Sequence, residues 1–319
     1  ISSNFVHCIT EDKSGLLWIG TVQFNGGINK VIMANPSFKQ IIPKTNLETL
    51  ADNVVRCIFQ DSNGYIWMAT KSGMIYVYTP DLQLQATLEN LYSGNSLIPG
   101  YNVYTMTEDD NGFLWMGTKG GGVLVSSTSI INKPDSYKKL HFNIYQNNPA
   151  DTTSLSNNFV YSILQDSRKK IWIGTYGGGI NLVESRTADA LVCKRINTEN
   201  STLSNDHVRH LFEDSRQRIW VATTFGLNLL EKTHLQNDSL QFRTFLYDPQ
   251  HIRSISYNDI IHIFEDTKHR MWFGTFGGGL NMLEKLDASS ASFAHFRQRD
   301  GLSNDAVFAI LEDLSLIHI

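Results

Sequence analysis

The sequence VYSILQDSRKKIWIGTYGGG, from Val160 to Gly179, decides the fold of this chain. It holds one of six tryptophans, and all six occupy the same position of a repeated phrase. In each copy an apolar run leads to an Asp and a short turn, and then to Trp, an apolar residue, Gly or Ala, and Thr. The six are Trp18, Trp67, Trp115, Trp172, Trp220 and Trp272. Their spacing of 48 to 57 residues is about that of a kelch-type propeller blade.

Each repeat is expected to contain four short strands. In the fourth repeat the β-type runs are Phe159–Leu164, Ile171–Thr175, Gly179–Val183 and Ala190–Ile196, separated by turn sequences such as DSRKK and YGGG. Four strands per repeat around an axis is the plan of a β-propeller. A parallel β-helix needs much shorter repeats. The sequence therefore predicts an all-β fold, a β-propeller of four-stranded blades.

The repeats are expected to form one ring, because each unit buries its faces only against its neighbours. Residues 1–302 contain six blades, and residues 303–313 contain the first strand of a seventh, so we expect an incomplete seven-bladed propeller. The tail at 314–319, LSLIHI, has neither Trp nor Gly, and we interpret it as a truncation or an artefact. The chain begins at Ile1 inside a repeat, which indicates a piece of a longer protein.

Composition narrows the classes of function. The net charge of −4 gives no basic field of the kind that nucleic acid requires, so no nucleic-acid partner is expected. No run of residues approaches the 18 or more apolar residues of a membrane span. These properties indicate a folded domain that acts on a ligand or a protein.

The repeated phrase resembles the two-component regulator propeller repeat. Its best copies are Asp12–Asn29, Asp109–Val123, Asp166–Asn181 and Asp266–Asn281, which match D-x-x-G-x-(L/I)-W-(I/M)-G-T-x-x-G-G-(I/L)-N. The connectors before the repeats, such as SLSNN at Ser154–Asn158, belong to the same pattern. The second and fifth copies depart from it mildly, with Ala69 and Ala222 in place of Gly.

That resemblance implies a role and a compartment. In this family such repeats form the periplasmic sensor region of hybrid two-component histidine kinases, anchored in the inner membrane. It implies an oligosaccharide as ligand, and a kinase outside this chain as the output. It also implies a second propeller and a β-sandwich domain of the same parent chain as partners, and a homodimer of the parent. It carries over no catalytic residue and no cofactor, so this fragment is not expected to be an enzyme.

Two motifs suggest catalysis or metal binding at first sight. An acidic or amide-acid pair precedes every turn, as in Glu108-Asp109 and Gln165-Asp166. A feature present in every blade serves every blade, so we interpret the Asp as a turn cap and not as an acid or base. The ten histidines, which include His207, His210 and His262, form no metal-binding motif, so no metal site is expected.

The informative positions are those at which equivalent residues differ. Five residues before the repeat Asp, on the expected innermost strand, the chain has His7, Arg56, Tyr104, Tyr161, Arg209, Ile261 and Phe308. The loop after the repeat Thr adds Phe24, Lys71, Lys119, Tyr176, Phe225 and Phe276 at the same end. Arginine with aromatic rings suits sugars and acidic sugars. From these sets we predict a ligand site at His7, Arg56, Tyr104, Tyr161, Arg209, Phe308, Tyr176, Phe276, Lys71 and Lys119. The alternative is that these side chains only fill space between blades.

Two other functions remain open at this point. A propeller enzyme, such as a polysaccharide or lactone lyase, would need His, Tyr or Arg residues that converge with a metal at one end. A protein-interaction scaffold would present a flat, apolar face. Propellers serve all three purposes, so the fold alone does not decide between them.

Overall fold

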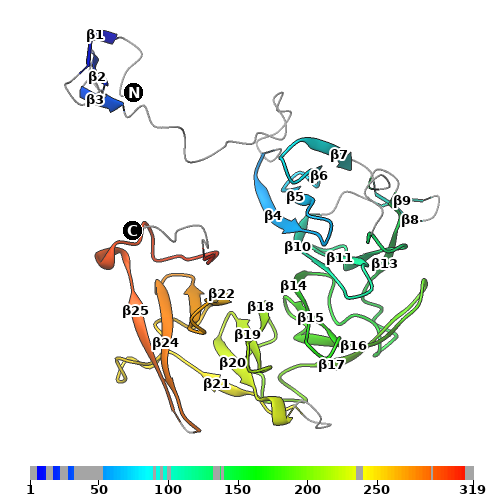
Figure 1. Cartoon of the computed structure of the whole chain (residues 1–319). Coiled ribbons are helices and arrows are strands. Elements are labelled where there is room, and N and C mark those ends of the chain that lie inside the picture. The colour runs from blue at the N-terminus through cyan, green and yellow to red at the C-terminus, as the bar shows by residue number, and fades with distance from the viewer. Residues whose placement is uncertain are drawn as a thin grey trace. The chain divides into compact units, whose positions relative to one another are not determined.

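A computed structural model of the chain divides it into two units, Ile1–Thr45 and Asn46–Ile319. In the first unit the structure describes the backbone of three strands and no side chains. In the second unit it describes residues 53–88, 91–93, 96–98, 102–131, 137, 140–234, 240–288 and 290–312. The His7 side chain, Phe24 and the tail at 314–319 therefore lie outside the described residues (Figure 1).

The first unit contains a three-stranded antiparallel sheet. Its strands, in spatial order, are β1 (Val6–Glu11), β2 (Leu17–Thr21) and β3 (Ile28–Val31). They correspond to the first three strands predicted for the first blade. Any fourth strand of that blade would fall within residues 32–50, which are outside the described residues.

The second unit contains five four-stranded antiparallel sheets whose strands follow one another in chain order. We number the blades as in the sequence, so the first sheet of this unit is blade 2. Blade 2 has β4 (Val55–Gln60), β5 (Ile66–Thr70), β6 (Ile75–Tyr78) and β7 (Leu84–Leu88); blade 3 has β10 (Val103–Glu108), β11 (Leu114–Thr118), β12 (Val123–Ser126) and β13 (Phe142–Tyr145). Blade 4 has β14 (Val160–Gln165), β15 (Ile171–Thr175), β16 (Ile180–Arg186) and β17 (Leu191–Ile196); blade 5 has β18 (Val208–Glu213), β19 (Ile219–Thr223), β20 (Gly226–Leu230) and β21 (Arg243–Phe245). Blade 6 has β22 (Ile260–Glu265), β23 (Met271–Thr275), β24 (Leu280–Leu286) and β25 (Ala291–Phe296).

The remaining elements are small. A two-stranded ribbon of β8 (Leu91–Ser93) and β9 (Ser96–Ile98) lies between blades 2 and 3 in the sequence. Two short 3₁₀ helices, η2 (Lys232–His234) and η3 (Gln298–Asp300), occur in connections. Among the described residues there is no α-helix, and thus none that is long and apolar enough to cross a membrane.

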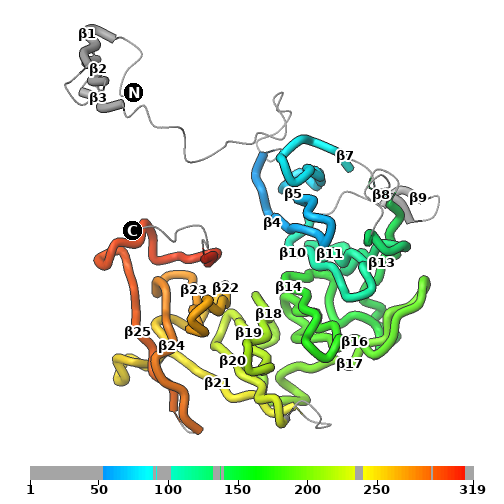
Figure 2. The backbone as a smooth tube through the Cα atoms, in the orientation of Figure 1, coloured from blue at the N-terminus to red at the C-terminus, as the bar shows by residue number. Residues whose placement is uncertain are grey.

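The first strand of each blade is the innermost one. Consecutive first strands contact each other, β4 with β10, β10 with β14, β14 with β18 and β18 with β22. Within the second unit the five blades therefore follow one another around a common centre, with their fourth strands outside (Figures 1 and 2). This arrangement confirms the predicted all-β propeller of four-stranded blades.

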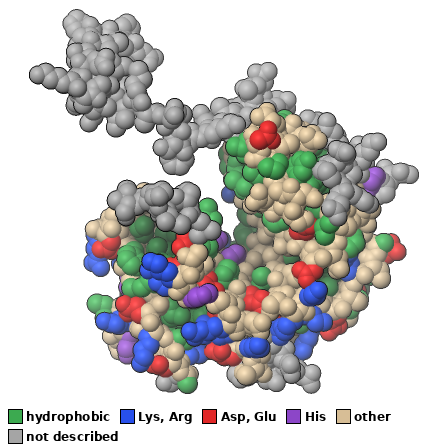
Figure 3. Space-filling model, in the orientation of Figure 1, with side chains coloured by type: hydrophobic (Ala, Val, Ile, Leu, Met, Phe, Trp, Pro, Cys, Tyr) green, Lys and Arg blue, Asp and Glu red, His purple; other side chains and the backbone are tan. Residues whose placement is uncertain are grey.

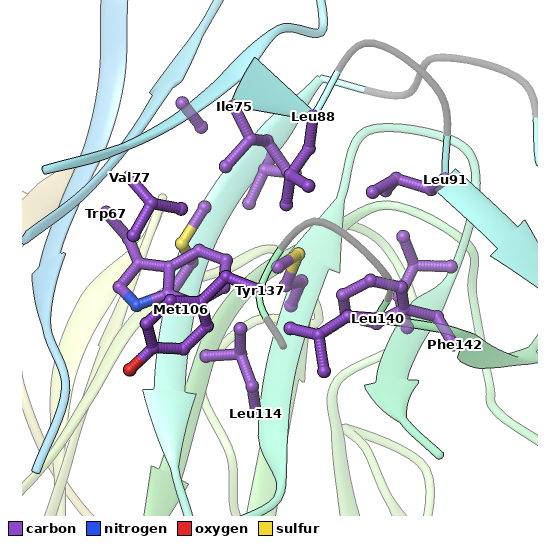
Figure 4. Close-up of a cluster of buried hydrophobic side chains, with 14 of the residues drawn as sticks. Trp67, Ile75, Val77, Leu88, Leu91, Met106, Leu114, Tyr137, Leu140 and Phe142 are labelled. Atoms are coloured by element: carbon purple, nitrogen blue, oxygen red, sulfur yellow. The ribbon is translucent and has the colours of Figure 1, made fainter. Parts of the chain in front are cut away.

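The hydrophobic cores lie between successive blades, and a tryptophan stands in each. Trp67 of blade 2 is fully buried against Met106, Leu114 and Phe142 of blade 3 (Figure 4). Trp115, Trp172 and Trp220 occupy the equivalent place against blades 4, 5 and 6. Each tryptophan comes from the second strand of its blade, as the repeated phrase requires.

The repeat aspartate caps its own turn and holds its own tryptophan. In blade 4, Oδ1 of Asp166 accepts hydrogen bonds from the backbone N–H groups of Arg168 and Lys170, both at 2.9 Å. Its Oδ2 accepts the indole N–H of Trp172 at 2.9 Å. The same indole bond occurs in blades 2, 3, 5 and 6. The structure thus agrees with a structural role for the repeated aspartate.

The acidic residue before that aspartate joins neighbouring blades. Glu213 of blade 5 accepts hydrogen bonds from the backbone N–H and the hydroxyl of Ser167 in blade 4, at 2.6 and 2.8 Å. Glu108 and Glu265 bond in the same way to Ser62 and Ser215 of the preceding blade. The paired carboxylates therefore serve two structural purposes, the Asp within a blade and the Glu between blades.

Residues 303–312 lie against blade 6 in the manner of a seventh inner strand. Glu312 accepts the backbone N–H and hydroxyl of Thr267, which repeats the bond between blades, and Ala306 forms an isolated bridge with Phe276. No strand is assigned from 307 to 312, and Leu311 is 89% exposed. Trp272 is only half-buried, in contrast to the four tryptophans that have a complete blade beside them.

Candidate ligand-binding site

Every inner strand has a β-bulge at one and the same position. The strand pairing shifts register in blade 4 between Val160 and Ser162, so Tyr161 is the bulged residue. The bulged residues of the other blades are His7, Arg56, Tyr104, Arg209 and Ile261. A bulge redirects the side chain of its extra residue. The position that the sequence singled out as variable is thus the one position of the inner strand that is free from ladder pairing.

The loop after the second strand is fixed beside the start of the inner strand. The N–H of Tyr176 donates to the carbonyl of Phe159 at 2.8 Å, and Phe276 donates to Asp259 at 2.9 Å. Lys71 and Lys119 make the same bond to Val54 and Asn102. Within the second unit, the two predicted sets of residues therefore lie at one end of the blades. We call this end, defined by the bulged residues of blades 2 to 6 and these loop residues, the mouth.

Aromatic rings from two blades meet at the mouth. The rings of Tyr104 and Tyr161 lie 4.7 Å apart, and those of Tyr161 and Tyr176 lie stacked at 5.2 Å. The guanidinium of Arg56 lies 5.6 Å from the Tyr104 ring, and that of Arg209 lies 5.3 Å from the Tyr176 ring. Four blades thus contribute to a continuous row of side chains, which we call the tyrosine row: Arg56, Tyr104, Tyr161, Tyr176 and Arg209.

The two arginines of this row differ in their partners. Arg209 forms a bidentate pair with Asp259 of the next blade, with N–O distances of 3.1 and 2.8 Å. Arg56 is exposed and has no carboxylate partner among the described residues. The charge of Arg209 is therefore neutralised by Asp259, which also fixes the position of the guanidinium. The charge of Arg56 is available to a ligand.

Tyr161, in the middle of the row, is half-buried and in contact with two other rings. Burial raises its pKa, with a further increase from the neighbouring Tyr104, to which it is hydrogen-bonded. The phenol therefore stays neutral at physiological pH. It can exchange hydrogen bonds with a ligand hydroxyl, while the more exposed rings at the mouth offer faces for stacking.

The exposed rings lie on the side of blades 4 to 6. Phe225 and Phe276 are each about half exposed, and Phe159 is 40% exposed. Phe276 lies edge-on to Phe308, whose ring is 5.9 Å away. Of the predicted site residues, the tyrosine row is thus brought together, Phe276 and Phe308 form a second group, and Lys71 and Lys119 lie exposed in their loops.

Two residues of the mouth were not predicted from the sequence. His207 lies edge-on to the Tyr176 ring at 4.4 Å, and Asp259 holds Arg209. Both stand seven residues before the repeat Asp, where blades 2 to 6 carry Val54, Asn102, Phe159, His207 and Asp259, and the seventh inner strand carries Ala306. That position varies as much as the bulged one, so the same comparison, made two residues earlier, would have found them.

Comparison with models of known protein families identifies the repeat. The model of the two component regulator propeller matches the chain six times, at residues 1–23, 49–72, 97–120, 154–177, 202–225 and 254–277. The chain is built from two-component regulator propeller repeats. A comparison with curated protein sequences found no significant match.

Solved structures similar to this regulator propeller agree on the fold. The extracellular domain of the hybrid two-component system BT3049 from B. thetaiotaomicron is 23% identical, with a TM-score of 0.61, over 96% of this chain and 36% of that one. The chain thus spans little more than a third of that structure. PorZ, a surface component of the type-IX secretion system of Porphyromonas gingivalis, is 13% identical, with a TM-score of 0.57, over 96% of this chain and 44% of that one. Virginiamycin B lyase from Staphylococcus aureus is 14% identical, with a TM-score of 0.53, over 93% of this chain and 86% of that one. At these identities the likeness establishes the fold alone.

Next to the mouth, the regulator propeller holds a pair of stacked, partly buried histidines. The rings of His210 and His262, each one residue after the bulged position, lie 4.5 Å apart. Nδ1 of His210 accepts the backbone N–H of Ile263 in the next blade at 3.1 Å, as the Ser162 hydroxyl accepts that of Leu211. Burial, with the charge of His262, lowers the pKa of His210 to about 3. A neutral histidine that accepts a backbone bond between blades has a structural role. In the part of the chain that is described, no group of three metal-binding side chains occurs.

Proposed function

We propose that this chain is the ligand-binding propeller of a hybrid two-component sensor and that an oligosaccharide binds at its mouth. The observation that carries the proposal is the bulge, which turns a blade-specific side chain toward the mouth in blade after blade. The residues around each bulge are repeated, so the difference between blades is concentrated where a ligand can reach. The six regulator propeller repeats support the role in sensing.

The chemistry of the mouth suits a sugar. The tyrosine row offers phenol hydroxyls and a guanidinium for hydroxyl and acidic groups, and the exposed rings of Phe225 and Phe276 offer apolar faces for the C–H surfaces of pyranose rings. The central space that the blades of the second unit surround is open in the space-filling view, with hydrophobic and histidine side chains at its border (Figure 3). A concave site with a few polar groups among apolar ones is typical of small-ligand binding.

The rest of the proposed role concerns the parent protein. We propose that the propeller lies in the periplasm, in a parent anchored in the inner membrane, and that ligand binding is passed to a histidine kinase outside this chain. A second propeller and a β-sandwich domain of the same parent would transmit the signal, within a homodimer. In this role the propeller binds its ligand and performs no catalysis.

Titration calorimetry of the 319-residue chain against a panel of neutral and acidic oligosaccharides tests the proposal. We expect at least one class to bind with a Kd of about 1 mM or tighter, since even a few polar and stacking contacts reach about −4 kcal/mol. Saturation by that ligand should shift the signals of the tyrosine row in an NMR spectrum. A folded chain that binds no member of the panel at such concentrations would contradict the proposal.

A further inference from the structure

The mouth is divided into a cationic part and an aromatic part. Blades 2 and 3 contribute Arg56, Lys71 and Lys119, all of which are exposed. The equivalent loop positions of blades 4 and 6 carry Tyr176 and Phe276. The backbone bonds of the loops place Lys71 beside Val54 and Lys119 beside Asn102, so the three cations lie on two adjacent blades at one end.

The charges of the two parts are balanced differently. Among the described residues, no carboxylate pairs with Arg56, Lys71 or Lys119. In the aromatic part, Arg209 is matched by Asp259. Asp206 keeps its own negative charge, and it accepts hydrogen bonds from the backbone N–H and the hydroxyl of Thr198 at 2.8 and 3.0 Å.

The cationic part attracts an anion for two physical reasons. Several cations grouped at the edge of a concave surface raise the local concentration of anions. The guanidinium of Arg56 also lies over the Tyr104 ring, which orients it and leaves its N–H groups free for a carboxylate or sulfate. The whole chain is acidic, with a net charge of −4, so this positive edge is local and not a consequence of composition.

We infer that the ligand of the mouth is an anionic oligosaccharide, whose carboxylate or sulfate group binds at Arg56 with Lys71 and Lys119 while its sugar rings extend over the aromatic part. The inference rests on the proposed function and specifies its ligand class and orientation. Uronate and sulfate share the chemistry that this arrangement recognises, a compact anion carried on a ring.

The decisive experiment uses pairs of probes that differ only in charge. An oligouronate and its methyl ester form one pair, and a sulfated oligosaccharide and its desulfated form another. Calorimetry with the 319-residue chain should show that, in at least one pair, the anionic member binds about tenfold more tightly than the uncharged member. Which pair shows the difference distinguishes the carboxylate from the sulfate. Equal affinity within both pairs overturns the inference.

Variants locate the anion. Arg56→Gln should weaken binding of the anionic probe about tenfold and binding of the uncharged probe much less, so that the preference for the anionic probe is lost, and Lys119→Gln should reduce that preference to a smaller degree. Lys170→Gln, an exposed lysine in the turn at the other end of blade 4, is the matched control and should change neither. All three residues are exposed, so the variants should melt with the parent chain. An Arg56→Gln variant that keeps its preference for the anionic probe overturns the inference.

The outcomes also separate this inference from the proposed function. If neutral oligosaccharides bind and depend on the tyrosine row, while charge makes no difference, the mouth is a sugar site and the anionic preference is wrong. If no carbohydrate of either kind binds to the folded chain, the proposed function itself fails.

Discussion

The two ends of a blade are built by different rules. At the turn end, blades 2 to 6 share one set of bonds, in which the aspartate caps its turn and accepts the indole N–H of the tryptophan. At the mouth, the bulged residue is Arg in blades 2 and 5, Tyr in blades 3 and 4, and Ile in blade 6. Repetition therefore identifies the scaffold, and differences at a fixed backbone position identify the surface that can be specific.

The largest effect is expected at the turn end. Trp172→Ala should destabilise the chain by about 3 to 5 kcal/mol, because it empties the core between blades 4 and 5. Lys170→Ala, in the exposed turn just before it, should change the free energy of unfolding by less than about 0.5 kcal/mol. Urea unfolding followed by circular dichroism measures both. Similar losses for the two variants would mean that the tryptophan does not support the core.

The aspartate of the same end gives a pH-dependent prediction. Burial acts to raise the pKa of Asp266, but hydrogen bonds from Trp272 and from the backbone and guanidinium of Arg270, together with the charge of Arg270, outweigh it and lower the pKa to about 2. The carboxylate therefore stabilises the fold above about pH 4, and this contribution is lost as the pH falls to about 2.

Asp266→Ala should cost about 1 to 3 kcal/mol at neutral pH, since it leaves the indole N–H without its acceptor. In this variant, part of the loss of stability that the parent chain shows in acid should be absent. Asp189→Ala, at an exposed aspartate, is the control and should have little effect. Parallel pH profiles of the Asp266 variant and the parent chain would refute this role.

The partly buried histidines His210 and His262 refine the contrast between the two ends, because their position varies between blades and yet has a structural role. His210 is neutral in the folded chain, with a pKa lowered to about 3, and takes up a proton more readily when unfolded. Stability should therefore fall as the pH drops from about 6.5 toward 3, by up to about 1.4 kcal/mol per pH unit for this one proton. Burial also lowers the pKa of His262, which adds in the same direction.

The double variant His210→Gln with His262→Gln should flatten this part of the profile, because glutamine does not titrate and can still accept the bond from Ile263. His251→Gln, at an exposed histidine paired with Asp248, should change the slope much less, because an ion pair on the surface contributes little to stability. Chemical unfolding at several pH values between about 4 and 7 measures the slope. A profile that keeps its slope in the double variant would show that other groups cause it.

The smallest effect is expected for the bond between blades at the turn end. Glu213→Ala removes two hydrogen bonds to Ser167, and because the site is exposed we expect a loss of about 1 kcal/mol. Glu199→Ala, at an exposed glutamate in a connector, is the control. Thermal melting is sufficient to compare them. A loss as large as that of Trp172→Ala would mean that the contact between blades depends on the turns and not on the core.

Sequence alone predicted most of the fold, because the fold is written in a repeated pattern. The strands predicted for the fourth repeat agree with β14 to β17 to within a few residues, and the tryptophans lie where the period placed them. The candidate site residues on the inner strands were chosen because they vary between repeats, and their role in binding stays a prediction. The bulge that sets them apart could not be predicted, because it is a property of strand pairing and Val160, Tyr161 and Ser162 carry no sign of it.

The remaining features of the site depend on contacts between blades. The pair of Arg209 and Asp259 joins residues 50 positions apart, and the row from Tyr104 to Tyr176 joins two blades. Such contacts follow from how one blade packs on the next, which a single sequence does not specify. The pairing of Arg209 and the isolation of Arg56 therefore became visible only in the structure.

The most direct test of the account compares the parent chain with Tyr161→Ala in a calorimetric titration with the tightest-binding oligosaccharide of the panel. Tyr161 is the bulged residue of blade 4 and the centre of the tyrosine row. We predict that its loss weakens binding by about 1 to 3 kcal/mol, the scale of one anchor contact, while the melting temperature stays nearly unchanged. Unchanged affinity in a folded variant would contradict the claim that the varied position at the mouth is where ligand binds.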